Sequence, residues 1–188
     1  GTGIPVAPGP TPVGGTIEKD TTWYAGASPY ILDRPVLVKD KATLTIEAGT
    51  EIRSRGAALI VEGGLVARGD GERMISWDTA EPGRSWEGIV IRNVKEKEIS
   101  LSYNRIQNAV TGLALQSASP LVEACEFSGN AAAVRIGGSF AKPRLVRNNL
   151  LKNKEAAVII TDGAQPLLTE NRLQDNLREG VRVEGAAP

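Results

Sequence analysis

The chain has 188 residues and carries 22 basic and 22 acidic side chains, so its formal net charge is zero. A balanced charge argues against a surface built for nucleic acid, because phosphates attract strongly basic proteins. No run of about 18 apolar residues occurs, so we expect no membrane span. With 41% hydrophobic and 23% charged residues the composition is that of a globular protein, and the single Cys125 excludes an internal disulfide.

The first residues are rich in proline and glycine. Such a composition is typical of flexible or extended tethers, so we interpret residues 1–15 as a linker or a disordered end. Residues 16–188 are expected to form one domain. Within it we expect a cap at residues 16–40 and regular coils over residues 42–184.

The predicted cap contains three of the few aromatic residues of the chain, Trp23, Tyr24 and Tyr30. A repeat protein must cover the exposed end of its core, and its terminal units differ from the others for this reason. We therefore interpret these aromatic side chains as cap residues and not as ligand contacts.

A short pattern recurs from residue 88 to residue 184, in which a small residue precedes two alternating apolar residues. Its spacings are 24, 21, 24 and 23, from the small residues Gly88, Gly112, Ala133, Ala157 and Gly180. A second marker, a proline before an apolar residue, recurs every 23 residues at Pro120, Pro143 and Pro166. A fixed period in the low twenties indicates a solenoid.

Residues 42–77 add short apolar runs of three to five residues that are separated by glycines. No segment shows the 3.6-residue period of an amphipathic helix, so the pattern predicts an all-β fold. We expect three short strands in each coil of about 21–24 residues. Each strand would pair in parallel with its equivalent one coil away, at a spacing of about 4.8 Å.

Side chains alternate between the two sides of a strand, so the register predicts which of them point inward. The first strand of the coils contributes Ile89, Ile91, Leu113, Leu115, Val134, Ile136, Val158, Ile160, Val181 and Val183. The second strand contributes Leu101, Val122, Leu145 and Leu168, and the third contributes Ile106, Phe127, Leu150 and Leu173.

Two columns of corner residues follow from the same stacking. One holds Asn104, Cys125, Asn148 and Asn171, and the other holds Asn130, Asn153 and Asn176. Stacked amides can hydrogen-bond along a column and to the backbone of the corner, so we interpret both columns as structural ladders. The alternative is a ligand-binding row. We interpret Cys125 as a buried small side chain and not as a nucleophile, because the chain has no histidine to activate it.

Residues 44–50, 59–69, 75–77 and 86–89 resemble the opening coils of bacterial right-handed parallel β-helix proteins. The coils that follow resemble the pectin-lyase-like superfamily of exported β-helices, and the resemblance covers residues 20–184. It implies a right-handed single-stranded parallel β-helix. It also implies an exported parent chain, located outside the cell, in the periplasm or on the cell surface.

That superfamily includes polysaccharide lyases, hydrolases, adhesins and members without known catalysis, and the fold alone does not decide among them. The two outward columns of the first strand read Val90, Ala114, Arg135, Ile159, Arg182 and Arg92, Gln116, Gly137, Thr161, Glu184. Neither column gathers the carboxylates of a calcium site, and the absence of histidine removes the hydrolase motif. We expect no catalytic residue, no metal and no cofactor.

We therefore predict a non-catalytic exported β-helix that serves as a rigid scaffold or binding module for a polysaccharide or a cell-envelope protein. The candidate binding residues are Arg92, Gln116, Arg135, Arg182 and Trp86. Two alternatives remain open: a carbohydrate-active enzyme or a fragment of one, and a module that forms homo-oligomers by stacking its coil ends.

Overall fold

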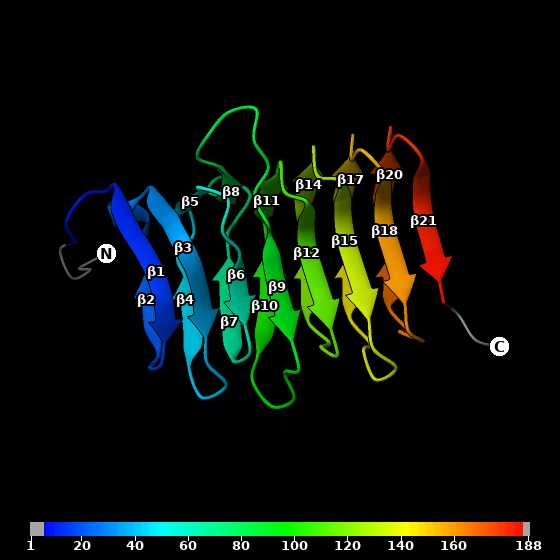
Figure 1. Cartoon of the computed structure of the whole chain (residues 1–188), viewed down its shortest axis with the longest axis horizontal. Helices are drawn as coiled ribbons and strands as arrows, with labels where there is room; N and C mark the ends of the chain where they lie inside the picture. The colour runs from blue at the N-terminus through cyan, green and yellow to red at the C-terminus, as the bar shows by residue number, and fades with distance from the viewer. Residues whose placement is uncertain (1–5, 186–188) are drawn as a thin grey trace.

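The structure, a computed structural model, describes residues 6–185. Its strands stack in rows along one long axis, and the chain advances along this axis from the N-terminal to the C-terminal end (Figure 1). The predicted parallel β-helix is confirmed, because every strand pair is parallel and links one coil to the next. The described residues contain no helix long and apolar enough to cross a membrane.

The coils have three faces. Face 1 contains β6 (Leu59–Val61), β9 (Ile89–Arg92), β12 (Thr111–Gln116), β15 (Ala132–Gly137), β18 (Ala156–Thr161) and β21 (Glu179–Glu184). Face 2 contains β2 (Thr21–Trp23), β4 (Thr43–Ile46), β7 (Gly64–Arg68), β10 (Ile99–Ser102), β13 (Leu121–Glu123), β16 (Arg144–Val146) and β19 (Leu167–Thr169). Face 3 contains β5 (Glu51–Ser54), β8 (Ile75–Thr79), β11 (Asn104–Gln107), β14 (Glu126–Ser128), β17 (Asn149–Leu151) and β20 (Arg172–Gln174).

One long strand, β3 (Tyr30–Val38), joins faces 1 and 3 into a single 14-stranded sheet. Its first residues pair with β5 on face 3, and Val36 to Val38 pair with β6 on face 1. Face 2 is a separate seven-stranded sheet. In the coil that contains β3, two of the three expected strands are therefore one continuous strand, which bends at the corner between faces 3 and 1.

The predicted linker of residues 1–15 is wrong at its C-terminal end. Strand β1 (Thr11–Ile17) lies alongside β3, with Thr11 paired to Tyr30 and Gly15 paired to Val36. Val13 and Ile17 pack against the core, and this packing together with the free edge of β3 outweighs the proline and glycine content. Residues 1–5 of the predicted linker lie outside the described residues.

The predicted cap forms from β1, β2, β3 and the short 3-10 turn η1 (Ala25–Ala27). Trp23 and Tyr30 stack with ring centroids 4.9 Å apart, and each is only 4% exposed. The Tyr30 hydroxyl accepts a hydrogen bond of 2.8 Å from the Tyr24 backbone N–H. Two of the three predicted aromatic residues thus fill the interior of the first coil.

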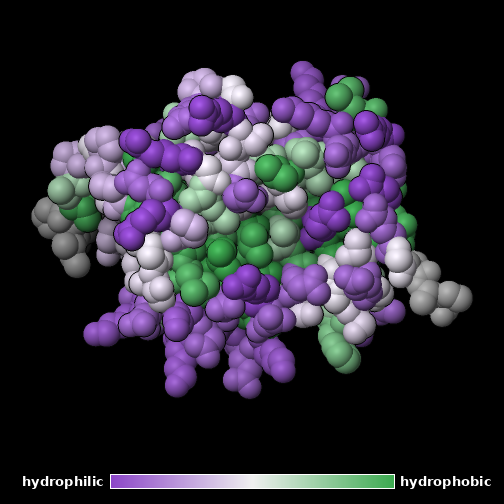
Figure 2. All heavy atoms as spheres, viewed as in Figure 1, coloured by the Kyte–Doolittle hydropathy of each residue, from purple (hydrophilic) through white to green (hydrophobic). Residues whose placement is uncertain are grey.

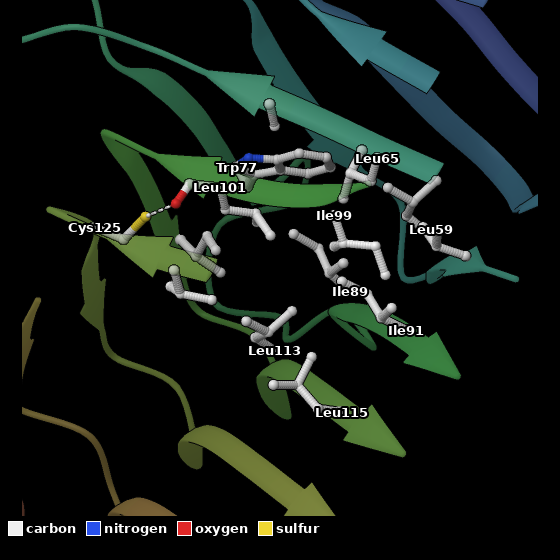
Figure 3. Packing of buried hydrophobic residues seen from close by; sticks show 14 of the residues in the cluster. Leu59, Leu65, Trp77, Ile89, Ile91, Ile99, Leu101, Leu113, Leu115 and Cys125 are labelled. Atoms are coloured by element: carbon white, nitrogen blue, oxygen red, sulfur yellow. Dashed lines mark hydrogen bonds between the residues drawn. The ribbon is translucent and has the colours of Figure 1, made fainter. Parts of the chain in front are cut away.

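The core is a column of stacked aliphatic layers (Figure 3). The predicted register is confirmed: Leu113 pairs with Ile89 on one side and with Val134 on the other, and all three are buried. The predicted burial fails in the last coil, where Val181 is 45% and Val183 is 59% exposed. These two residues keep the predicted pairing with β18, but no described coil lies beyond them.

Each corner of the regular coils turns through a residue whose backbone φ is positive, a conformation that residues other than glycine rarely adopt. Between faces 2 and 3 these residues are Tyr103, Ala124, Arg147 and Glu170. Between faces 3 and 1 they are Asn108, Gly129, Lys152 and Asp175, and after face 1 they include Asn93, Ser117, Gly138 and Asp162. In the first two corners the next residue is a member of a predicted column, except after Asn108, where it is the buried Ala109. The left-handed step therefore directs the side chain of that next residue inward.

Candidate functional site

The corner between faces 2 and 3 holds Asn104, Cys125, Asn148 and Asn171. The Asn148 side chain donates to Asn171 Oδ1 at 3.0 Å and to the Val122 carbonyl oxygen at 3.0 Å. Asn148 Oδ1 in turn accepts the Cys125 backbone N–H at 2.9 Å. At the other end of the column, Asn104 Oδ1 accepts the Trp77 indole N–H at 2.8 Å, so these amides bond one another and the corner backbone.

Cys125 occupies the position of an asparagine in this column. It is 2% exposed, and its thiol lies 3.5 Å from the Leu101 carbonyl oxygen, which it approaches as a donor (Figure 3). Desolvation by burial raises the pKa of Cys125 to about 12. A thiol with so high a pKa stays protonated near neutral pH, so this cysteine has the chemistry of a core residue.

The corner between faces 3 and 1 holds Asn130, Asn153 and Asn176. The backbone N–H of Asn130 donates to Asn153 Oδ1 at 3.2 Å, and that of Asn153 donates to Asn176 Oδ1 at 3.0 Å. The Asn153 side chain also donates to the carbonyl oxygen of Phe127 at 3.2 Å. Asn130 and Asn153 are fully buried, so neither offers an amide to an external ligand.

The prediction that Trp86 is a surface binding residue is wrong. Trp86 is 1% exposed and lies parallel to Trp77, with ring centroids 6.3 Å apart. Its indole N–H donates to the Gln107 carbonyl oxygen at 2.8 Å, and it pairs with Ala109 at the corner between faces 3 and 1. Burial of an indole whose N–H is hydrogen-bonded stabilises the core. The next residue along the chain, Glu87, is exposed.

The other four candidate residues lie on the outer side of face 1 but form no common site. Arg92 pairs with Glu62, with Nε and Oε2 3.0 Å apart, and is the register partner of the exposed Gln116. Arg182 lies 2.8 Å from a Glu184 carboxylate oxygen. Arg135 forms no ion pair with any described residue, and it lies in the other column with Arg182, separated from it by Ile159.

An apolar stripe crosses the N-terminal half of face 1. We define the apolar stripe as Leu37, Ile60, Val90 and Ala114, which are register partners on four adjacent strands. All four are half-buried, and Figure 2 shows a band of hydrophobic residues on this side of the molecule. The stripe ends at Arg135, the partner of Ala114 on β15.

Carboxylates on the outer surface are mostly held by basic side chains or by backbone groups. Glu126 pairs with Arg105 at 3.1 Å, and Glu98 pairs with Arg68. Asp70 accepts the backbone N–H groups of Arg73 and Glu72, and these hydrogen bonds lower the pKa of its carboxyl. Among residues 6–185 no three histidine, cysteine or acidic side chains group as they would around a metal ion.

A hollow of about 530 Å³ lies at the corner between faces 1 and 2, which we name the corner hollow. It is lined by Asn93, Val94, Lys95, Ser117, Ser119 and Phe140. The described residues of its lining supply hydroxyl, amide, ammonium and aromatic groups but no carboxylate. This mixture suits a ligand with both polar groups and an apolar face.

Phe140 gives the corner hollow its aromatic wall. It stands on a turn closed by the Ala141 backbone N–H, which donates to the Gly138 carbonyl oxygen at 3.0 Å. Ala141 is fully buried and anchors the turn, while the Phe140 side chain is 86% exposed. Because Ala141 fills the inward position, the side chain of Phe140 is left in solvent.

Sequence reasoning missed Phe140. The available signal was its setting, because it follows Gly137, Gly138 and Ser139 in a turn where the other regular coils carry small or polar residues. Aromatic residues make up only 4% of the chain, so one placed in a glycine-rich turn is conspicuous. The pattern that predicted the strands does not extend to such turns.

Comparison with known proteins gives one match. Residues 87–187, which are more than half of the chain, match the family described as a right-handed beta helix region. Neither the curated proteins nor the solved structures contain a match to the chain. The match begins at the residue before Gly88, where the repeat in the sequence begins.

Proposed function

Because the chain belongs to the right-handed beta helix family, we propose that it is a non-catalytic module that binds a glycan in the corner hollow. The β-helix supplies a rigid support, since each coil is hydrogen-bonded to its neighbours on all three faces. The observation that carries this proposal is the 86% exposure of Phe140 at the wall of the hollow.

The chemistry of the corner hollow fits a sugar ring. The apolar C–H face of a pyranose packs against an aromatic ring, while its hydroxyls need donors and acceptors at the edges. Asn93 offers both, and the Ser119 hydroxyl, which already accepts the Lys142 backbone N–H at 2.9 Å, can still donate. Lys95 adds one positive charge to the lining, which favours a sugar that carries an acidic group.

The arrangement of carboxylates supports binding over catalysis. Glycoside cleavage uses two carboxylates on either side of one bond. On face 1 the acidic side chains of Glu62 and Glu184 are already paired with arginines of neighbouring or the same strand. The described lining of the corner hollow contains no acidic side chain, so a sugar ring seated in it does not lie between two carboxylates; Asp40, Glu62 and Glu96 line a neighbouring hollow that shares Asn93, Val94 and Lys95.

The test compares glycan binding by the wild type and by Phe140→Ala. An array of neutral and uronate-containing glycans identifies the ligand, and titration calorimetry measures the affinity of each oligosaccharide found. We expect Phe140→Ala to weaken binding at least tenfold, because an aromatic contact at the centre of a site is worth about 1.5 kcal/mol or more. Tyr103→Ala is the matched control, since Tyr103 is 39% exposed at a different corner.

Two results would contradict the proposal. The first is an array without any binding that depends on Phe140. The second is turnover of a uronate polymer by the purified protein, which would favour the carbohydrate-active enzyme.

We also propose that the protein acts outside the cytoplasm, an assignment supported by its resemblance to exported β-helices. Fractionation of cells that express the whole gene tests this location.

A further inference from the structure

The outer side of face 1 has the properties of a contact surface. The apolar stripe runs across four strands that stand about 4.8 Å apart, and its side chains are half-buried although they point away from the core. Ala114, the smallest side chain of the stripe, lies on β12 near the middle of the face. A small residue at the centre lets a second flat sheet approach closely.

Two opposite charges flank this centre without a partner of their own. Arg135 on β15 and the exposed Glu87, which lies two residues before β9 at the corner between faces 3 and 1, form no ion pair with any described residue. The other charged groups on face 1 are satisfied within the chain: Arg92 by Glu62, and Arg182 by Glu184. The strands β9 and β15 are the two neighbours of β12, one on each side.

We infer that face 1 is the contact between two copies of this chain, related by a two-fold axis that runs along β12. Such an axis preserves the strand direction and reverses the order of the coils. The β9 strand of one copy therefore lies opposite the β15 strand of the other. Ala114 of one copy faces Ala114 of the other. Glu87 of each copy lies on the same side of the axis as Arg135 of the other copy.

The geometry permits both ion pairs at once, because a two-fold contact is self-complementary. Glu87 precedes Val90 by three residues, and Val90 and Arg135 lie in one outward column because both are register partners of Ala114. This offset is about 10 Å along the strand and packed sheets lie about 10 Å apart, so the two backbones are about 14 Å from each other, a span that arginine and glutamate bridge when both side chains are fully extended. A pair partly covered by the apolar stripe is screened less than an ion pair in open solvent.

The size of the face sets the expected strength. The six strands of face 1 and the adjoining end of β3, about 4.8 Å apart and each about 15 Å long, present on the order of 500 Å² per copy, or about 1,000 Å² in total. That area lies at the low end for specific interfaces, so we expect a reversible dimer with a micromolar dissociation constant. None of the stripe residues, nor Glu87 or Arg135, lines the corner hollow, so loss of glycan binding in Phe140→Ala would leave this inference unchanged.

Charge reversal gives a sharp test. We expect sedimentation equilibrium of the wild type to show a concentration-dependent dimer between about 10 µM and 1 mM. Glu87→Arg alone and Arg135→Glu alone should each weaken the dimer at least tenfold, because each places two like-charge pairs in the contact. An equimolar mixture of the two variants should restore it, since both pairs of that mixed dimer are again complementary.

Arg105→Glu on face 3 is the matched control and should leave association unchanged. A wild type that stays monomeric over the whole range would overturn the inference. So would association that neither charge reversal alters, which would point to another surface such as the coil ends. Circular dichroism confirms that each variant is folded, which we expect because both side chains lie outside the core.

Discussion

The corner between faces 3 and 1 is filled in two ways along the β-helix. In the coil of β8 and β9 it is filled by Trp86, which stacks on Trp77. In later coils the same corner is filled by Asn130, Asn153 and Asn176, which are hydrogen-bonded to one another. The aromatic side chains bury a large apolar area in one layer, whereas the amides repeat a small polar unit.

The corner between faces 2 and 3 changes in the same direction along the chain. Its first positions hold Thr50 and Ile75, and the asparagines begin at Asn104. Thr50 is buried, and its hydroxyl donates to the Glu47 carbonyl oxygen at 2.6 Å. The family match starts at residue 87, so it covers the amide-filled coils and not the earlier ones. A solenoid can therefore keep one register while the chemistry of its corners changes.

Among the tests of this comparison, the largest loss of stability is expected from a substitution in the aromatic layer of Trp77 and Trp86. We expect Trp77→Ala to lower the free energy of unfolding by about 4 kcal/mol, because a fully buried indole is lost and a cavity remains. Asn104 Oδ1 also loses the indole N–H that it accepts. Urea unfolding followed by circular dichroism measures the change. Trp77→Phe keeps most of the burial and should cost about half as much, and equal costs would contradict a packing role.

The next test is the amide column. We expect Asn153→Ala to cost about 3 kcal/mol, because the buried Asn130 N–H and the Phe127 carbonyl oxygen would lose their partner. Asn176→Ala is the matched control in the last coil, where the side chain is half-buried and water can replace it. We expect about 1 kcal/mol there. Equal losses at both positions in urea unfolding would show that burial does not determine the value of an amide in this column.

A smaller effect concerns the cysteine that interrupts the other column. Burial raises the pKa of Cys125 from 9.0 to about 12, so the folded state holds a proton that the unfolded chain releases as the pH passes 9. The contribution of Cys125 is therefore complete below pH 9 and declines as the pH rises toward 12. Between pH 9 and pH 10 the wild type should lose about 1 kcal/mol more than Cys125→Ala.

Stability measurements at both pH values, made on the two proteins in parallel, separate this thiol from the other groups that titrate in alkali. A difference between wild type and Cys125→Ala that stays constant from pH 9 to pH 10 would contradict the assignment. Cys125→Asn extends the comparison, because it would continue the column of Asn104 and Asn148 with a third amide.

The smallest effect is expected outside the core. Arg92→Ala removes the ion pair with Glu62 on face 1, and both side chains are partly exposed. Exposed ion pairs contribute about 1 kcal/mol or less, so we expect a shift of that size in urea unfolding. A loss above about 2 kcal/mol would mean that the outer columns stabilise the coils as much as the corners do.

The sequence predicted the coils well because parallel stacking places like residues on like residues. Once Gly88, Gly112 and Ala133 fixed the period, the inward and outward sides of each strand followed, and the strand register matches this assignment. The same reasoning failed for Trp86, because its burial depends on how the loop before β9 folds back onto Ala109. A period describes the strands and contains no information on loops that interrupt it.

Two other features depended on contacts that no local pattern displays. Strand β1 forms because the edge of β3 is available, although proline and glycine dominate the preceding residues. Phe140 is exposed because Ala141 takes the buried position beside it. Both outcomes are decided by neighbours in space, so composition and spacing alone could not predict them.

The parallel pairing of each strand with its equivalents has a consequence for local opening. Strand β12, for example, is bonded to β9 and β15 and to no other strand among residues 6–185. The molecule therefore resembles a one-dimensional stack, in which a terminal coil can detach by breaking a single layer of contacts while an inner coil must break two. Amide hydrogen exchange should then slow progressively from β21 toward the centre, as if the chain frayed one layer at a time.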